Sequence, residues 1–198
     1  GEDSPDSKRR SQKTPSSARV PPPRRRSTFP RGFGLKSPAL RSTRDRLLGS
    51  IRTIESARRA GEPNYITDGI YQDGQLFRFA CADINERYQR RRVERVIAYD
   101  SAALPLAAPL AYFAGCGLNV IQPTSRGPLL ELESIPQGCR LLLVADVLHR
   151  GTQLASAATL LRQSKGELIE ICTLLEIADG KGSELLAPIS TYSVCSYR

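Results

Sequence analysis

Polar residues that could hold an anion follow a short aliphatic run at residues 141–144. They are Asp146, His149, Arg150, Gly151 and Thr152. Arg150 could attract a phosphate group. The backbone N–H groups of a glycine turn that opens a helix bind phosphate well. A second apolar run, at residues 93–99, ends in Asp100 and Ser101. We therefore treat the polar residues that follow these two segments as the candidate site.

Two of these residues also have an ordinary structural interpretation. A single loop histidine such as His149 is usually solvated or hydrogen-bonded, although it could contact a ligand phosphate. Asp146 could contact a ligand, or it could hold the turn as an N-cap residue does. The sequence leaves these alternatives open.

Alternating strands and helices must position these residues. We predict strands at residues 93–99, 118–122, 140–145, 169–177 and 189–197, and helices at 103–114 and 154–164. This order indicates an α/β fold with a central, mostly parallel sheet flanked by helices. Ligands of such sheets bind at the carboxyl ends of the strands.

The residues before position 93 show a less regular pattern of predicted elements. Leu47, Leu48, Ile51 and Ile54 form a helical stripe. Residues 65–70 and 75–80 are predicted as strands, joined by a hairpin turn at Asp73-Gly74.

The positive charge is concentrated at the N-terminus. The chain has 198 residues and a net charge of +9, and residues 1–46 contain thirteen Lys or Arg against four Asp or Glu. This surplus of nine leaves the remainder neutral. Residues 1–42 are rich in Ser, Pro, Arg and Lys, and we predict a disordered basic tail there because they cannot bury enough apolar area.

The tail contains two basic clusters, Lys8, Arg9, Arg10 and Arg24, Arg25, Arg26. Such clusters indicate nuclear import or binding to nucleic acid or another polyanion, although a solvated tail without a dedicated partner is the alternative. Ser-Pro and Thr-Pro steps make the tail a candidate phosphoprotein segment. A further basic stretch is predicted on the fold itself, at Arg87, Arg90, Arg91, Arg92 and Arg95, with Glu86 and Glu94 partly balancing it.

The cysteines and the hydropathy exclude several classes of protein. The five cysteines show no CxxC spacing, and we interpret them as reduced core thiols of a nuclear or cytoplasmic protein. One histidine and scattered cysteines predict no metal site. No apolar stretch is long enough to cross a bilayer, so no membrane association is expected.

The strand-and-loop motifs resemble those of the adenine phosphoribosyltransferase family. Residues 141–152 resemble the phosphoribosyl-diphosphate loop, and residues 97–101 with 108–117 resemble the pyrophosphate loop and the helix after it. Residues 174–197 are similar to the C-terminal region of the family. The resemblance implies a type I phosphoribosyltransferase-like domain at residues 43–198. It implies, for an active member, that adenine and phosphoribosyl diphosphate with Mg²⁺ yield AMP, and that the protein dimerises.

Several family residues are missing. The resemblance implies paired acids that contact the ribose hydroxyls, but Ala145 replaces the first and only Asp146 remains. The phosphate turn keeps Gly151 and Thr152 and loses the preceding Thr-Gly. Ala102-Ala103 replaces the Arg-Gly that should follow Asp100-Ser101.

The lid is missing as well. Only a short link joins Gln122 to Pro136, where the family has a long catalytic lid, and Gln122-Pro123 replaces an expected basic pair. If the losses of the acid, the arginine and the lid each cost ~2–4 kcal/mol of transition-state stabilisation, together they slow the reaction by ~10⁴–10⁹.

We therefore expect a catalytically impaired protein, with no confident catalytic residue. It would act as a nuclear scaffold or adaptor through its fold and its tail, as a homodimer or with a protein partner. An active adenine phosphoribosyltransferase and a non-catalytic nucleotide sensor are the alternatives.

Overall fold

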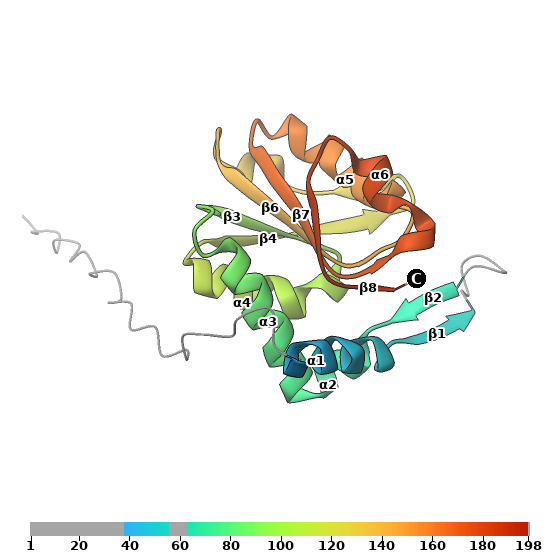
Figure 1. Cartoon of the computed structure of the whole chain (residues 1–198). Helices are drawn as coiled ribbons and strands as arrows, with labels where there is room; N and C mark the ends of the chain where they lie inside the picture. Colours follow the sequence, from blue (N-terminus) through green and yellow to red (C-terminus); the bar gives the residue numbers. More distant parts are fainter. Residues whose placement is uncertain (1–37, 56–62, 198) are drawn as a thin grey trace, which may run out of the picture. The chain divides into compact units, whose positions relative to one another are not determined.

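The computed structural model describes residues 38–55 and 63–197 (Figure 1). The two basic clusters of the predicted tail, Lys8 to Arg10 and Arg24 to Arg26, lie outside the described residues. Helix α1 (Pro38–Gly49) begins within the segment that we predict as tail. Proline suits a first helical position because its φ is already helical and it has no N–H group to satisfy.

A central sheet contains the strand order β5-β4-β3-β6-β7-β8. The strands are β3 (Arg95–Tyr99), β4 (Gly117–Thr124), β5 (Gly127–Leu129), β6 (Arg140–Leu148), β7 (Glu167–Ile177) and β8 (Thr191–Tyr197). All neighbouring pairs are parallel except β4 and β5. The predicted α/β fold with a mostly parallel sheet is therefore confirmed.

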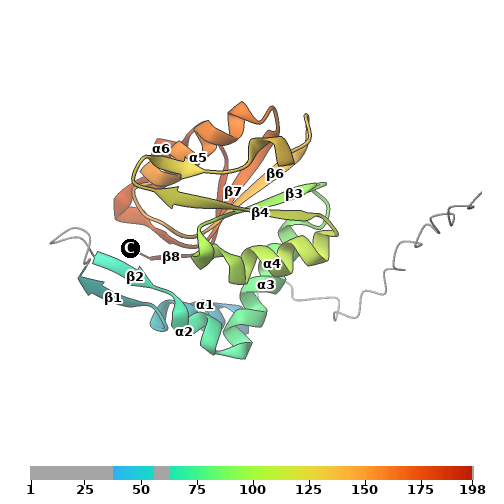
Figure 2. The same ribbon diagram turned by 180° about the vertical axis from the view of Figure 1, so that it is seen from behind.

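Helices cover both faces of this sheet. Figure 1 and the reverse view in Figure 2 show α3 (Gly74–Tyr88) and α4 (Leu104–Ala114) on one face, and α5 (Thr152–Gln163) and α6 (Gly182–Leu186) on the other. Successive residues of β6 serve both faces: Leu142 and Val144 join the core under α3 and α4, whereas Leu141 and Leu143 join the core under α5. Short 3₁₀ turns η1 (Ser101–Ala103), η2 (Leu132–Ser134) and η3 (Ala178–Gly180) complete the connections.

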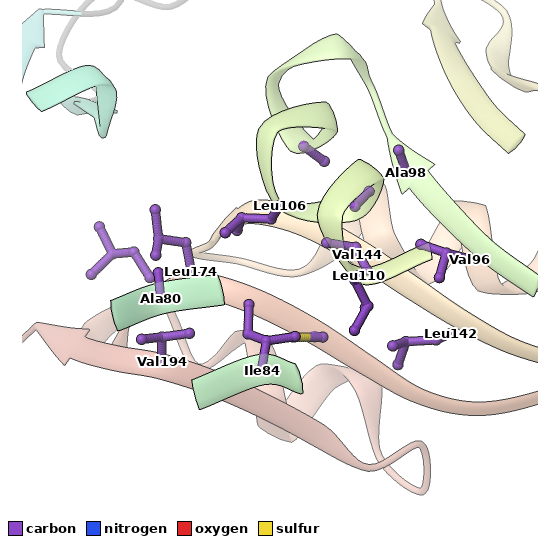
Figure 3. Packing of buried hydrophobic residues seen from close by; sticks show 14 of the residues in the cluster. Ala80, Ile84, Val96, Ala98, Leu106, Leu110, Leu142, Val144, Leu174 and Val194 are labelled. Carbon is purple, nitrogen blue, oxygen red and sulfur yellow. The ribbon is translucent and has the colours of Figure 1, made fainter. Parts of the chain in front are cut away.

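The core under α3 and α4 is mostly aliphatic. Figure 3 shows Ala80 and Ile84 of α3 facing Val144 and Leu174 of the sheet, with Leu106 of α4 beside them. Their burial explains why the strands read as nearly continuous aliphatic runs, since both faces of a parallel sheet are covered.

The predicted hairpin at Asp73-Gly74 is wrong. Asp73 is the N-cap of α3, and its carboxylate accepts from the backbone N–H groups of Gln75 and Leu76. The apolar residues that follow, Leu76 and Ala80, are four apart and both buried, which is a helical spacing rather than a strand spacing. A short helix, α2 (Asp68–Gln72), precedes this cap.

The predicted N-terminal helix is also misplaced. Helix α1 ends at Gly49, and Ile54 belongs to β1 (Arg52–Glu55), which pairs antiparallel with β2 (Pro63–Ile66). The short link after Gln122 contains a hairpin of β4 and β5, closed by a bond from Thr124 Oγ1 to the Gly127 carbonyl at 2.7 Å.

Among the described helices, none has both the length and the apolarity of a bilayer span. The five cysteines are free thiols, with Cys139, Cys172 and Cys195 buried and the other two half-buried.

Candidate functional site

The candidate site residues that follow β3 and β6 lie together at one edge of the sheet. Strands β3 and β6 are parallel neighbours, so their carboxyl ends meet. Asp100 and Ser101 follow β3, and Asp146 lies near the end of β6. Residues 149–152 join β6 to α5. The β1–β2 hairpin lies beside this edge, near the end of β8 (Figures 1 and 2).

Asp146 is held by two hydroxyl groups from a distant part of the chain. The Thr67 hydroxyl donates to one carboxylate oxygen, and the Tyr71 hydroxyl donates to the other at 2.5 Å. Thr67 is buried just before α2, and Tyr71 belongs to α2. Both oxygens of the remaining acid are therefore engaged within the protein.

No cation balances this carboxylate among the ion pairs of the described residues. Burial raises the pKa of Asp146, and the charge of Asp68 adds to this, while the Thr67 and Tyr71 hydroxyls lower it; the net pKa lies above its ordinary range. Burial and the carboxylate also raise the pKa of Tyr71. The hydroxyls therefore stay protonated and act as donors.

Sequence reasoning missed Thr67 and Tyr71. They lie more than seventy residues before Asp146, and no local pattern marks them as its partners. The only available signal was a threonine directly before Asp68, which is a common residue at a helix start.

Asp100 adopts a strained backbone conformation at the end of β3. Its φ of 67° and ψ of 167° fall in a region that is nearly exclusive to glycine. Its carboxylate accepts from the Ser101 backbone N–H at 2.5 Å and from the Ser101 hydroxyl at 3.0 Å. Asp100 thus caps η1 and keeps Ser101 beside it, at the place where the resemblance puts a pyrophosphate loop.

His149 packs in an aromatic cluster rather than in solvent. Its ring meets Tyr65 of β2 edge to face, with centroids 5.7 Å apart, and Tyr65 also contacts Tyr197 at the end of β8 at 6.5 Å. His149 is half-buried there. The histidine therefore links the loop after β6 to the hairpin and to the C-terminal strand.

The loop after β6 is docked against the segment that contains Gly180 and Gly182. A Cβ atom on either glycine would collide with His149, at its carbonyl oxygen in both cases. Gly151, with φ of 74°, lies against the Gly182 backbone, where an added Cβ would be 2.8 Å from the carbonyl oxygen. Close backbone packing therefore fixes the loop.

Part of the loop remains suited to an anion. Gly151 precedes the first turn of α5 and Thr152 opens that helix. Thr152 and Arg150 are exposed at this end. The N–H groups of a first helical turn favour phosphate, so residues 150–152 remain the predicted anion site.

The positions of the missing groups differ in their surroundings. Ala145 is 2% exposed in the core with residues of α5. Ala102, in the place of the expected arginine, is exposed, and Ala103 after it is fully buried. The expected lid is replaced by the β4–β5 hairpin.

Asp146 is the one acid of the expected pair that remains for a magnesium ion. Magnesium in such sites uses one or two carboxylates together with substrate phosphates. Asp146 has both oxygens engaged by hydroxyls. No cluster of three or more His, Cys, Asp or Glu suited to a metal occurs in the part of the chain that the structure describes.

The sequence matches none of the models of known protein families. It is 28% identical over 175 residues to the adenine phosphoribosyltransferase of Methylacidiphilum infernorum, covering 80% of this chain and 98% of the relative. It is 25% identical over 174 residues to that of Nitrosomonas europaea, covering 74% and 95%.

Solved structures agree with these relatives. The adenine phosphoribosyltransferase of Rhodothermus marinus superimposes with a TM-score of 0.71 at 19% identity, over 79% of this chain and 99% of that one. The enzyme of Thermoanaerobacter pseudethanolicus gives 0.70 at 19% identity, over 77% and 99%.

Proposed function

Because this chain has the adenine phosphoribosyltransferase-family fold and is a divergent relative of those enzymes, we propose that it no longer transfers phosphoribosyl groups. It acts as a scaffold or adaptor in the nucleus, where its fold contacts a second copy or a protein partner. Its basic tail, including Arg9, Arg10 and Arg24 to Arg26, binds nucleic acid or another polyanion.

The state of Asp146 supports the loss of activity. Each oxygen of Asp146 already accepts one hydroxyl bond, from Thr67 or from Tyr71. These two bonds use half of the lone pairs that a carboxylate offers and fix the orientation of the group. A ribose that needs another orientation must compete with bonds worth ~1.5–3 kcal/mol each.

The neighbouring positions support the same conclusion. Ala145 offers no second carboxylate, and Ala102-Ala103 offers no cation for a departing pyrophosphate. Charge that grows on a leaving group must be stabilised by preorganised cations or donors. A short hairpin cannot close over the edge as a long lid does, so water would stay in the site.

An activity assay tests this proposal. The full chain, incubated with adenine, phosphoribosyl diphosphate and Mg²⁺, should form no AMP above a protein-free blank. Steady AMP formation that scales with protein concentration would overturn the proposal and establish an active phosphoribosyltransferase.

Nucleotide sensing is the second candidate function. The retained turn at Gly151 and Thr152, with Arg150 exposed beside it, supports binding of AMP or phosphoribosyl diphosphate without turnover. A ligand that binds only the folded state raises stability by RT ln(1 + [L]/Kd). A rise in melting temperature with AMP, absent in Thr152→Ala, would support the sensor; no rise with either ligand would exclude it.

A further inference from the structure

The amino ends of β6 and β7 carry a second group of charged residues, at the opposite edge of the sheet from Asp146. A cavity of about 520 Å³ opens there. We call it the amino-edge cleft, and its lining residues are Arg90, Arg91, Arg92, Arg140, Glu167, Leu168 and Ile169. Arg140 begins β6, so the cleft lies roughly 20 Å along the strand from Asp146.

The cleft concentrates positive charge on an otherwise balanced fold. Residues 47–198 contain sixteen basic and sixteen acidic residues, yet the cleft is lined by four arginines and one glutamate. Like charges this close repel one another. An anion bound among them would relieve that repulsion.

Two of the arginines are held in place by acids. Arg91 lies 3.1 Å from Glu170, which is itself bound by Arg87. The Arg140 guanidinium donates to both oxygens of Glu167, at 3.0 and 3.2 Å. Side chains that are already ordered lose less entropy when a ligand binds.

Two arginines of the cleft have no acid beside them among the described residues. Arg90 and Arg92 are exposed, and neither forms an ion pair with any acid that the structure describes. Arg92 has a φ of 50°, which is uncommon for any residue except glycine. An arginine therefore occupies a turn where glycine would be less strained.

We propose that the amino-edge cleft binds a compact anion with several phosphate groups, such as a nucleoside triphosphate. Guanidinium groups match phosphate oxygens through paired N–H donors. The cavity volume lies within the range of small-molecule sites, about 300–1,000 Å³. Leu168 and Ile169 supply an apolar wall for the rest of the ligand.

The confinement of the charge favours a compact ligand over nucleic acid. A nucleic-acid surface shows a basic stripe that follows many phosphates. Here Arg90 and Arg92, which pair with no acid among the described residues, belong to one cavity. The proposal does not depend on whether the carboxyl edge is active, because it concerns the other end of the strands.

Calorimetric titration with inorganic tripolyphosphate tests the proposal on the full chain. The clustered tail cations are first replaced by glutamine so that the tail does not compete; they are Lys8, Arg9, Arg10, Arg24, Arg25 and Arg26. In this background Arg90→Gln/Arg92→Gln should weaken binding by about tenfold or more, because each arginine supplies a charge-assisted hydrogen bond.

A matched variant controls for net charge. Arg126→Gln/Arg162→Gln removes two exposed arginines outside the cleft and should leave the affinity within about twofold. Arg90→Lys/Arg92→Lys keeps the charge and loses the paired donors, so its affinity should fall between those of the glutamine variant and the parent. The melting temperature of each variant confirms folding.

Three outcomes overturn the proposal. Equal weakening in the two glutamine variants would show that tripolyphosphate senses net charge only. An unchanged affinity in Arg90→Gln/Arg92→Gln would place the anion elsewhere, for example at residues 150–152. A single-stranded oligonucleotide that needs Arg90 and Arg92, with no tripolyphosphate binding, would make the cleft a nucleic-acid surface.

Discussion

Asp146 and Glu170 are acids on adjacent strands with opposite surroundings. Asp146, near the carboxyl end of β6, accepts from two neutral hydroxyls. Glu170, in the first half of β7, accepts from Arg87 at 2.7 and 2.8 Å and from Tyr88 at 2.6 Å, and Arg91 lies 3.1 Å away.

The pKa values follow these partners. Burial raises the pKa of Glu170, but the bonds and charges of Arg87, Tyr88 and Arg91 outweigh it, so the net pKa is lowered. At Asp146 burial prevails and the net pKa is raised. Among the described residues, cations therefore lie beside the acid that joins α3 to the sheet, whereas none forms an ion pair with Asp146.

The largest expected effect is at Glu170. Glu170→Gln leaves Arg87 beside a buried neutral group, and removing one partner of a buried pair costs ~3–5 kcal/mol. The free energy of unfolding in urea should fall by about that amount at pH 7, while Glu184→Gln at an exposed position serves as the control. A loss no larger than the control's would show that the network does not stabilise the fold.

The pH dependence sharpens this prediction. Since the folded pKa of Glu170 is lowered, its contribution is complete above the ordinary glutamate range, about pH 4–5, and is lost as pH falls through the lowered pKa. Acid unfolding of the parent should therefore be steeper than that of Glu170→Gln.

The next largest loss of stability is expected when the missing acid of the family pair is restored. Ala145→Asp restores the carboxyl group that the family resemblance implies, but places it in an apolar core at 2% exposure. Burying it should cost ~2–4 kcal/mol, measured by urea unfolding, without restoring AMP formation. Ala155→Asp, at a half-buried position of α5, should cost less; equal costs would contradict the burial argument.

At Asp146 we expect a smaller effect on stability, and its dependence on pH should run in the opposite direction to that of Glu170. Because its folded pKa is raised, the folded protein retains a proton that the unfolded chain releases, so stability falls as pH rises from about pH 4 to that pKa. Asp146→Asn should flatten this fall and change stability at pH 7 by only ~1 kcal/mol. A loss of stability as large as that of Glu170→Gln would contradict the difference that we infer between the two acids.

The smallest effect on stability concerns the N-terminal residues. Deleting residues 1–37 stops before α1, whose Leu47 is fully buried, and should leave the melting temperature within ~2 °C. The same deletion should abolish binding to a polyanion such as heparin. A larger fall in melting temperature would show that residues 1–37 contribute to the fold.

Some patterns of local origin were predicted correctly. The aliphatic runs that became β6 and β7 follow from burial on both faces of a sheet. The helix predicted at residues 103–114 is α4 (Leu104–Ala114), which ends at the αL residue Gly115. Asp73-Gly74 was misinterpreted because an aspartate before a glycine suits both a hairpin turn and a helix N-cap. Only the later spacing of Leu76 and Ala80 distinguishes them.

The sequence predicted the basic stretch between Arg87 and Arg95, but not the acid that pairs with it. Glu86 and Glu94 were expected to balance it, whereas the structure pairs Arg87 and Arg91 with Glu170. Glu94 instead accepts from the backbone N–H of Arg140. Neighbours in sequence need not face one another on a helix end, so charge counting cannot name such pairs.

The sequence by itself determined the main alternation of strands and helices after residue 93, the fold class and the groups missing from the family motifs, because these depend on hydrophobic period and residue identity. Only the tertiary structure decided the surroundings of the family residues that remain. It placed Thr67 and Tyr71 on Asp146, and it gathered Arg90, Arg92 and Arg140 around one cavity. Contacts between residues far apart in the chain are set by how the helices pack on the sheet, and no local pattern encodes them.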